Sequence, residues 1–373
     1  MKIRGAILDT IGAPAPFGTS RPLRVAQLEL DAPGPHEVLV ALDAAGVCHS
    51  DLSVVDGNRS RPVPMLLGHE AAGRVVFTGE EVTDLAPGAQ VVMTFLPRCG
   101  QCAGCATDGK APCLRGSAAN EAGQLLDGGR RLHENGDRVA HHLGVSAFAT
   151  HAVVDRRSIV PVDDDIPSHV AALLGCAVLT GGGAVLNAAR PTPGSSIAIV
   201  GLGGVGLAAA LVALAHPDVH VIGIDPLPSK LAAATALGVH ETLTPDQADQ
   251  RSLRVTCTIE AAGRASVFAS AYRWTAPGGT TATVGLPRAD DTIPFAPLSL
   301  VAEGRTVVGS YLGSAIPARD IPIFAQMWRE GRLPVEKLVS SVINLDQINE
   351  AMDHLADGSQ LRQIISLTDT VPA

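Results

Sequence analysis

Aromatic residues are scarce in this chain of 373 residues, because Phe, Tyr and Trp together make up only 3% of it. Apolar residues nevertheless account for 46% of the sequence, so we expect an interior built mainly of Ala, Val, Leu and Ile. An excess of positive charge is also missing, since the formal net charge is −9. This balance argues against a general nucleic-acid-binding role.

Long uninterrupted apolar runs are absent as well. The longest ones are broken by glycine and fall short of the roughly 20 residues needed to cross a bilayer. The first residues, M-K-I-R-G-A-I-L-D-T, carry Asp9 within an apolar run and show no cleavage signature. We therefore expect a cytoplasmic protein with reduced thiols and no membrane partner, and a chain of this length predicts two domains.

Four of the seven cysteines lie in the segment 99–113, which reads C-G-Q-C-A-G-C-A-T-D-G-K-A-P-C. They are Cys99, Cys102, Cys105 and Cys113, with the spacing C-x2-C-x2-C-x7-C. Zinc accepts four thiolates tetrahedrally, and the glycines of this segment permit the turns that wrap a chain around one ion. Disulfides would need an oxidising compartment, and iron–sulfur clusters usually have other spacings. The spacing therefore favours a structural zinc over these alternatives and over unliganded core cysteines.

Two shorter motifs also bring metal-capable side chains together. Residues 44–52 read A-A-G-V-C-H-S-D-L, and residues 66–73 read L-L-G-H-E-A-A-G. Each is a short loop flanked by glycine that offers a Cys or His next to an acidic residue. On the residues alone, a metal site and purely structural roles both stay open.

Short apolar runs punctuated by Gly and Pro over residues 1–45 predict an antiparallel, barrel-like region. Residues 114–142 are polar and glycine-rich without a sustained period. Residues 167–190 predict a helical region that glycines 181–183 interrupt. Strand and helix patterns alternate from residue 197 onward, which is typical of a parallel sheet.

A glycine-rich motif follows the first strand of this later region. Residues 197–215 read I-A-I-V-G-L-G-G-V-G-L-A-A-A-L-V-A-L-A, with Gly201, Gly203 and Gly206 between a predicted strand and helix. The next predicted strand ends at Asp225. This context indicates a dinucleotide site, with the pyrophosphate at the helix N-terminus and the carboxylate on the ribose hydroxyls. The charge of Asp225 disfavours a 2′-phosphate, so NAD is favoured over NADP, and Lys230 is either a ribose contact or a solvated helix residue.

Together these motifs resemble the zinc-dependent medium-chain alcohol dehydrogenases. The four-cysteine loop, G-V-C-H-S-D-L, L-G-H-E-A-A-G, L-L-G-C and G-L-G-G-V-G with Asp225 occur in the order and spacing of that family, across essentially the whole chain. The resemblance implies an α/β fold with two domains. Residues 1–178 and 313–373 would form a GroES-like, β-rich catalytic domain, and residues 179–312 a Rossmann NAD-binding domain with a doubly wound parallel sheet.

The resemblance also implies two zinc ions per chain, one structural and one catalytic. The three ligands of the catalytic zinc would be Cys48, His69 and Cys176, which leaves a fourth position for water or substrate. Asp51 would orient His69 by accepting its remaining ring N–H, and Glu70 would lie behind the metal. Cys257 is left over and is predicted to be an ordinary core residue.

The reaction that the resemblance implies is NAD-linked oxidation of an alcohol to an aldehyde or ketone, or its reverse, by zinc-alkoxide formation and hydride transfer. Ser50 matches the first position of the family's proton relay. Ser53 stands where many relatives have a histidine, and a hydroxyl does not hold a proton near pH 7. We therefore expect the relay to end in water.

Four further positions match the family's cofactor contacts. His49 and Arg362 match contacts to the pyrophosphate, and Thr180 and Val205 match residues that press against the nicotinamide. Ordinary surface or packing roles are the alternatives for each.

The segment between Cys113 and Thr150 resembles the larger family members, the liver-type and glutathione-dependent formaldehyde dehydrogenases, and this predicts a homodimer. The formaldehyde enzymes place an arginine a few residues after the fourth loop cysteine, but Ser117 stands at that position here and Arg115 is only close to it. Ser50 should leave more room beside the zinc for bulkier or secondary alcohols. We expect an ordinary small-molecule alcohol or aldehyde substrate. The alternatives are thiol-dependent oxidation of an S-hydroxymethyl adduct and, from a different class, a non-catalytic zinc- and nucleotide-binding redox sensor.

Overall fold

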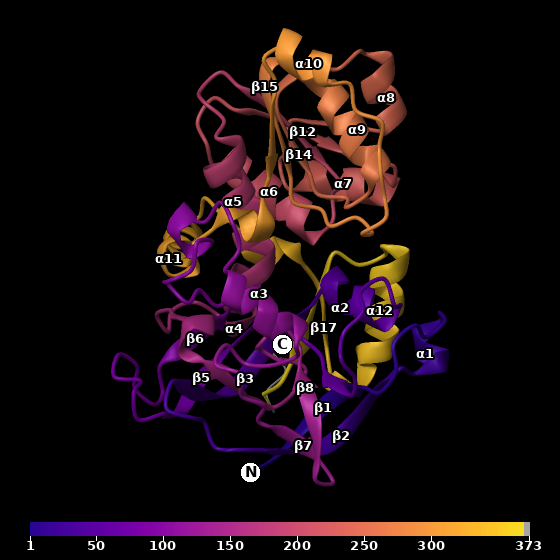
Figure 1. Cartoon of the computed structure of the whole chain (residues 1–373). Coiled ribbons are helices and arrows are strands. Elements are labelled where there is room, and N and C mark those ends of the chain that lie inside the picture. Colours follow the sequence, from indigo (N-terminus) through magenta and orange to yellow (C-terminus); the bar gives the residue numbers. More distant parts are fainter. Residues whose placement is uncertain (369–373) are drawn as a thin grey trace. The chain divides into compact units, whose positions relative to one another are not determined.

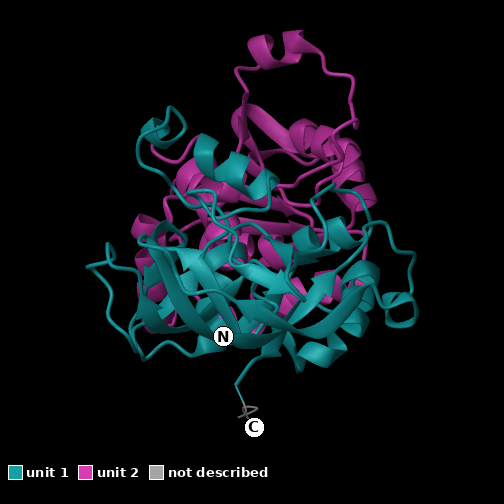
Figure 2. Ribbon diagram, turned by 60° about the horizontal axis from the view of Figure 1, so that its bottom comes forward, with its two compact units in different colours: residues 1–107, 112–176, 339–373 teal, residues 108–111, 177–338 magenta. Residues whose placement is uncertain are grey.

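The computed structural model describes residues 1–368 and divides into two compact units (Figure 2). Unit 1 comprises Met1–Thr107, Pro112–Cys176 and the chain from Val339 onward, and unit 2 comprises Asp108–Ala111 and Ala177–Leu338. The units are regions of dense internal contact, and the domain limits predicted at 178 and 313 stay a prediction. Unit 1 nevertheless joins segments from both ends of the chain.

Unit 1 is built on two mostly antiparallel sheets. One closes into a barrel in the strand order β1 (Lys2–Leu8), β2 (Leu23–Leu30), β7 (Leu132–Glu134), β8 (Asp137–His141) and β4 (Met65–Leu66). The other runs β10 (Ile159–Pro161), β6 (Gln90–Met93), β5 (Ala71–Thr78), β3 (Glu37–Val47), β18 (Arg362–Ser366) and β17 (Val339–Ile343), with β9 (His151–Asp155) also paired to β3. The barrel-like region predicted from the first residues is part of this arrangement.

The period-two pattern of β3 explains its place at the centre of the second sheet. Val38, Val40 and Leu42 are buried, whereas the residues between them are only half-buried. Strand β18 pairs antiparallel with β3, with Ile364 opposite Gly46. This pairing carries the C-terminal part of the chain to the strand that leads into the first metal-capable motif.

The described residues of unit 1 form five α-helices. They are α1 (Phe17–Ser20), α2 (His49–Val55), α3 (Leu114–Glu121), α4 (Ser168–Leu173) and α12 (Ile348–Asp357). Short 3-10 helices over the two units span Cys105–Thr107, Arg156–Ser158, Tyr311–Ser314, Val335–Leu338 and Leu345–Gln347.

Unit 2 contains a six-stranded sheet whose neighbours are all parallel. Its order is β13 (Glu241–Leu243), β12 (His220–Ile224), β11 (Ser196–Val200), β14 (Val255–Glu260), β15 (Thr275–Thr283) and β16 (Thr306–Gly309). In chain order this is 3-2-1-4-5-6, the doubly wound Rossmann arrangement. The near-continuous burial of β11 and β12 is typical of strands covered on both faces.

Helices cover this parallel sheet, as the resemblance implied (Figure 1). Helices α6 (Gly204–Leu214), α7 (Pro228–Ala236), α8 (Pro245–Gln250) and α9 (Ala265–Trp274) pack on its strands, and unit 2 also contains α5 (Leu179–Gly183), α10 (Pro297–Ala302) and α11 (Pro317–Arg329). Helix α7 packs on β12 and β13, and α9 packs on β14 and β15.

The predicted break at glycines 181–183 is wrong. Helical turns continue from Ser168 to Ala189, with π-helical turns at Leu174–Val178 and Ala184–Ala189. A Cβ on Gly181 would lie 2.1 Å from the Val205 carbonyl oxygen, so the glycine serves close helix packing rather than a turn.

This helical segment is the only one in the described residues that is long and apolar enough to cross a membrane. In the most apolar 18-residue stretch of this segment, 89% of the residues are buried inside the structure. Such burial is typical of a core helix, so the segment is weak evidence for a membrane span.

Candidate functional site

Four predicted site residues of unit 1 come together in a buried cluster. Donor atoms of Cys48, His69, Glu70 and Cys176 all lie within 4.8 Å of one another. None of the four side chains has more than 6% of its surface exposed. Two thiols, an imidazole and a carboxylate that converge in this way form a donor set suited to zinc.

The sequence C-x-x-D places two of the site residues through a helix cap. Cys48 is the N-cap of α2, and its backbone N–H donates to Asp51 Oδ2 at 3.2 Å. Asp51 is thus fixed one turn into the helix with no exposed surface. Its other oxygen, Oδ1, accepts from the backbone N–H of Gly68 at 3.2 Å.

His69 lies in the loop between β4 and β5 and is oriented from both sides of its ring. Nδ1 lies 3.0 Å from Asp51 Oδ1, and Nε2 lies 3.4 Å from Cys176 Sγ. The first contact requires the Nδ1–H tautomer in the neutral ring, which leaves the Nε2 lone pair facing the thiols. This is the arrangement that the resemblance implied for Asp51.

Glu70 lies in the same loop, where its carboxylate contacts Arg362 and lies close to Gly46. Its Oε2 accepts from Arg362 Nη1 at 3.3 Å, and both side chains are buried. Its Oε1 has no hydrogen-bond partner among the residues that the structure describes. A Cβ on Gly46 would lie 2.5 Å from Oε1, so a side chain at that position of β3 would have to displace the Glu70 carboxylate. An unpartnered, fully buried carboxylate oxygen beside two thiols is an atom that a metal ion would satisfy.

Cys176 enters the cluster from the π-helical turns Leu174–Val178. The preceding Gly175 lets these turns approach β6, because a Cβ there would lie 2.0 Å from the Met93 carbonyl oxygen. The motif L-L-G-C is thereby explained by a close contact between backbone segments.

Burial and mutual contact shift the titration of the cluster. The Cys176 thiol, which acts as a hydrogen-bond partner, lowers the pKa of Cys48 well below its usual value. Burial raises the pKa of Glu70 to about 7, against the opposing charge of Arg362. Although burial opposes it, the Asp51 carboxylate raises the pKa of His69. A thiolate at Cys48 is thus favoured even before an ion binds.

Sequence reasoning assigned no role to His142, which the structure places beside this cluster. His142 Nδ1 lies 3.2 Å from Asp51 Oδ1, and the ring stands edge-on to His69 at 5.6 Å between centroids. The one hint in the sequence was the histidine pair of H-H-L-G at residues 141–144. Only the tertiary fold brings this pair next to Asp51.

The four-cysteine loop converges as its spacing predicts. The sulfurs of Cys99, Cys102, Cys105 and Cys113 lie within 4.8 Å of one another, and none is in a disulfide. The Sγ atoms of Cys99 and Cys105 are 4.0 Å apart, and those of Cys102 and Cys113 are 3.9 Å apart. A tetrahedral zinc with Zn–S bonds of about 2.3 Å sets its sulfurs roughly 3.8 Å apart, whereas a disulfide needs about 2.05 Å. The geometry therefore fits a single ion.

Backbone N–H groups aimed at the sulfurs prepare them for a cation. Cys99 and Gly116 donate to Cys113 Sγ, both at 3.3 Å, and Leu114 donates to Cys102 Sγ at 3.4 Å. The N–H groups of Cys105 and Leu114 lower the pKa of Cys102 to about 6. These bonds stabilise thiolate and orient it, as in a preformed metal site.

The glycine loop of unit 2 has the geometry of a phosphate cradle. Gly201 has a φ of 92°, and a Cβ on Gly206 would lie 1.8 Å from the Gly201 carbonyl oxygen. A Cβ on Gly203, at the N-cap of α6, meets nothing within 4 Å. The first and third glycines are thus required by the protein itself, and the second faces open space where a ligand can approach.

Asp225 follows β12 and is held beside this loop. Its Oδ2 accepts from the Leu202 N–H at 2.8 Å and its Oδ1 from the Leu227 N–H at 3.0 Å. The carboxylate is 4% exposed, and its remaining lone pairs can accept from ribose hydroxyls. Lys230 lies in the first turn of α7, two residues after Pro228.

The other predicted site residues are distributed over the two units. Ser50 and His49 lie in the first turn of α2 in unit 1. In unit 2, Thr180 on α5 lies next to Gly181, which packs against the backbone of Val205 on α6. The cofactor roles assigned to these residues and to Arg362 stay predictions.

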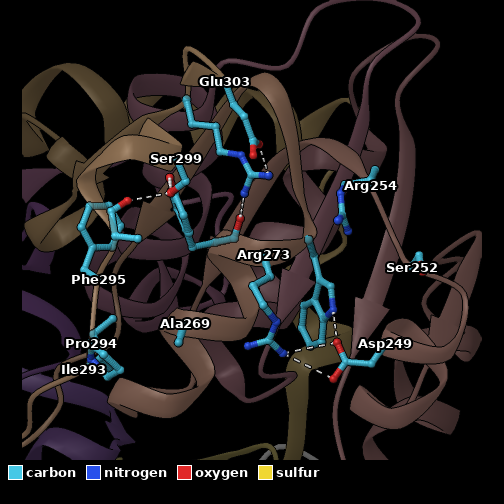
Figure 3. Close-up of a pocket in the computed structure, with 14 residues that line it drawn as sticks. Asp249, Ser252, Arg254, Ala269, Arg273, Ile293, Pro294, Phe295, Ser299 and Glu303 are labelled. Carbon is cyan, nitrogen blue, oxygen red and sulfur yellow. Dashed lines mark hydrogen bonds and ion pairs between the residues drawn. The ribbon is translucent and has the colours of Figure 1, made fainter. Parts of the chain in front are cut away.

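A cavity of about 570 Å³ lies entirely within unit 2 and contains none of the predicted site residues (Figure 3). Its lining includes Arg254, which precedes β14, and Arg305, which precedes β16, so it lies at the amino ends of the strands. Nucleotides bind at the carboxyl ends of such sheets. Within the cavity, Arg273 is paired with Asp249 (Figure 3). The cavity is therefore not the dinucleotide site.

Comparison with known proteins agrees with this geometry. Residues 34–164 match the alcohol dehydrogenase GroES-like domain, and residues 204–330 match the zinc-binding dehydrogenase domain. The chain belongs to the zinc-dependent medium-chain alcohol dehydrogenase family, with a GroES-like domain and a Rossmann domain. It is thus an oxidoreductase of the class that acts on alcohols, which confirms the predicted fold class and family.

Three relatives are similar over nearly their whole length. A geraniol dehydrogenase from Castellaniella defragrans is 36% identical, with 97% of each chain covered. The crystal structure of an alcohol dehydrogenase zinc-binding domain protein from Burkholderia ambifaria has a TM-score of 0.91 at 31% identity, with 99% of each chain covered. That of a benzyl alcohol dehydrogenase from Acinetobacter calcoaceticus has a TM-score of 0.89 at 30% identity, covering 99% of this chain and 100% of that one.

Proposed function

We propose that this protein oxidises primary alcohols to aldehydes, and catalyses the reverse reaction, with one catalytic zinc, one structural zinc and NAD. The observation that carries the proposal is the buried convergence of Cys48, His69 and Cys176 beside Asp51. A structural zinc site is closed by four strong protein ligands, as the four-cysteine loop is. The buried cluster has three such ligands, with Glu70 as a weaker fourth. It therefore suits a zinc ion with one coordination position open to a substrate.

Zinc bound to the buried cluster supplies Lewis acidity toward an alcohol oxygen, and NAD supplies the hydride acceptor. Cys48 and Cys176 contribute negative charge that moderates the acidity of the ion. Asp51 holds the Nδ1–H of His69, so that Nε2 stays directed at the ion. Ser50 is the proposed first carrier of the alcohol proton, with water as the next, because Ser53 cannot hold it.

NAD rather than NADP is proposed because of Asp225. Two backbone N–H groups hold this carboxylate next to the ribose position, where its negative charge would repel a 2′-phosphate. The residues that follow, Pro226, Leu227 and Pro228, offer no cation to bind such a phosphate.

The substitution Asp225→Ser should therefore change cofactor preference. We expect kcat/KM for NAD to fall about 10-fold or more, since a charge-assisted hydrogen bond is worth about 1.5–3 kcal/mol, while kcat/KM for NADP rises. Steady-state rates with both cofactors and one alcohol measure this ratio. The exposed Asp246→Ser on α8 is the matched control and should leave the ratio unchanged. An unchanged ratio in Asp225→Ser would contradict the assignment.

Allylic or benzylic primary alcohols are the proposed substrate class. By their names, two of the relatives act on geraniol and on benzyl alcohol. In both alcohols the oxidised carbon adjoins a π-system, so the aldehyde product is conjugated and hydride loss is easier. The small side chain of Ser50 is compatible with substrates of this bulk.

A panel of alcohols tests the proposed function. With NAD and the zinc-loaded full chain, we expect kcat/KM for benzyl alcohol and geraniol to exceed that for ethanol by roughly 10-fold or more, because each methylene-sized group seated in an apolar pocket adds about 1 kcal/mol or more. Formation of NADH is followed by absorbance. Turnover only with formaldehyde plus glutathione would instead support the thiol-adduct alternative and the formaldehyde dehydrogenase subgroup.

The non-catalytic alternative makes a different prediction about metal content. A redox sensor would need only the zinc of the four-cysteine loop, and it would turn over none of these substrates. Two zinc ions per chain together with NADH formation would rule it out.

A homodimer is proposed from the edge of the Rossmann sheet. Strand β16 ends the sheet order and pairs only with β15 among the described strands. Val307 on this strand is 38% exposed, and Leu298 and Val301 on α10 are 76% and 79% exposed. An open strand edge beside exposed apolar side chains suits a second copy of the chain. The cytoplasmic location stays a prediction.

A further inference from the structure

We propose that His142 is a positioning residue for the zinc ligand His69, which it supports by sharing and holding the carboxylate of Asp51. This inference rests on the proposed zinc site in the buried cluster. His142 is 1% exposed, and its Nδ1 lies 3.2 Å from the same Oδ1 atom that binds His69 Nδ1 at 3.0 Å. One carboxylate oxygen thus lies between two imidazoles.

The loop that carries His142 is tied to the segment that carries His69. The N–H of Ala147 donates to the Gly68 carbonyl at 3.0 Å, and that of Phe148 donates to the Leu67 carbonyl at 2.9 Å. A Cβ on Gly68 would lie 2.5 Å from the Phe148 nitrogen, so the two segments are in close contact. The distance between the two histidines is therefore set by backbone hydrogen bonds.

The conformation of this loop is unusual and well anchored. Leu143 and Ser146 have φ values of 52° and 55°, in the left-handed region that side chains other than glycine rarely adopt. The Ser146 hydroxyl accepts from the His142 N–H at 3.0 Å. Local backbone strain of this kind persists where the surroundings enforce it and is common near functional sites.

The contact with Asp51 dictates which nitrogen of His142 carries the proton. A bare Nδ1 lone pair would face a carboxylate oxygen at 3.2 Å and repel it, so Nδ1 must be the protonated nitrogen. His142 therefore directs a second N–H toward the side of Asp51 that orients His69, as a close electrostatic contact rather than a hydrogen bond. Without it, Oδ1 would keep only His69 and the Gly68 N–H, and the carboxylate would be freer to turn.

The test measures zinc affinity in the full chain, by titration with a competing chelator while zinc per chain is recorded. For His142→Leu we expect the buried zinc to bind about 10-fold more weakly, the lower end of the usual cost of losing an outer-shell partner. The zinc of the four-cysteine loop should be retained, and this retention reports folding. Cobalt exchanged into the buried site should show an altered absorption spectrum in the same variant.

Two further variants separate positioning from packing. His142→Asn places an amide N–H where Nδ1 was, so zinc affinity should stay within about threefold of the wild type. His141→Gln is the matched control, because His141 Nε2 accepts from the Arg131 N–H at 3.0 Å and forms neither a hydrogen bond nor an ion pair with Asp51. It should leave both zinc affinities unchanged. If His142→Leu does not fold, His142→Gln replaces it, since its amide lies at the Nε2 position and should not restore affinity.

The outcomes distinguish this inference from the proposed function. Wild-type affinity in His142→Leu, or an equal loss in His142→Leu and His142→Asn, would overturn the positioning role. A wild-type chain that takes up only one zinc would instead overturn the proposed function itself.

Discussion

The substitution Cys176→Ser should reduce zinc from two ions per chain to one and lower kcat/KM for any alcohol by more than about 100-fold. Loss of an outer-shell partner of a metal ligand already lowers metal affinity or activity by about 10- to 100-fold. Cys176 is itself a proposed ligand, so its loss should cost more. Serine retains the size of the side chain but its hydroxyl does not ionise near neutral pH. The neighbouring Cys48 thiol would also lose the partner that lowers its pKa. Zinc analysis and NADH formation measure the two effects.

Cys257→Ser is the matched control for this result. Cys257 is buried on β14, and its Sγ donates to the Ala189 carbonyl at 3.4 Å, a bond that a serine hydroxyl can also make. We expect two zinc ions per chain and near wild-type kcat/KM. A Cys176→Ser variant that kept both zinc ions and full turnover would contradict the assignment of the buried cluster as the catalytic site.

Local sequence patterns predicted those parts of the site whose geometry is also local. The glycines around Gly203 and the four-cysteine loop each act within one turn or loop. The parallel sheet could equally be predicted from the sequence, because strands buried on both faces appear as continuous apolar runs such as residues 197–200. The resemblance then supplied Cys176 and the pairing of His69 with Asp51, which no spacing could have given.

Contacts made by distant backbone segments were not predictable. The glycines at 181–183 looked like a helix break, because a glycine required for close packing and one required for a turn are identical in sequence. Arg362 was predicted as a phosphate contact, and the pairing of β18 with β3 places it against Glu70. The position of His142 beside Asp51 depends on two backbone hydrogen bonds between residues 67–68 and 147–148, which the sequence does not reveal.

The segment 114–142 illustrates the same limit on a larger scale. It shows no sustained period, yet it contains α3 and the hairpin of β7 and β8 that closes the barrel. Helix α3 begins directly after Cys113, whose Sγ accepts from the Gly116 N–H. The order of this segment thus depends in part on the metal loop before it, which a hydrophobic pattern does not record.

The substitution Cys102→Ser in that loop should destabilise the protein while leaving the buried cluster intact. Structural zinc contributes on the order of 10 kcal/mol of binding free energy in small zinc domains. Its loss should free residues 99–113 and the start of α3, since the Leu114 N–H donates to Cys102 Sγ. Each kcal/mol of lost stability lowers Tm by about 2 °C in a large domain. Because several kcal/mol should be lost, we expect Tm to fall by at least about 5 °C.

Calorimetry, zinc analysis and limited proteolysis together check this result. One zinc per chain should remain, proteolytic cleavage should appear within residues 99–113, and kcat/KM of the folded protein at 25 °C should stay within a few-fold of the wild type. Lys110→Ser alters an exposed residue of the same loop and should keep both zinc ions and the wild-type Tm. If Cys102→Ser retained two zinc ions and its Tm, the four thiols would not be holding a metal. If it instead lost turnover with its Tm unchanged, the loop would belong to the catalytic machinery rather than to the fold.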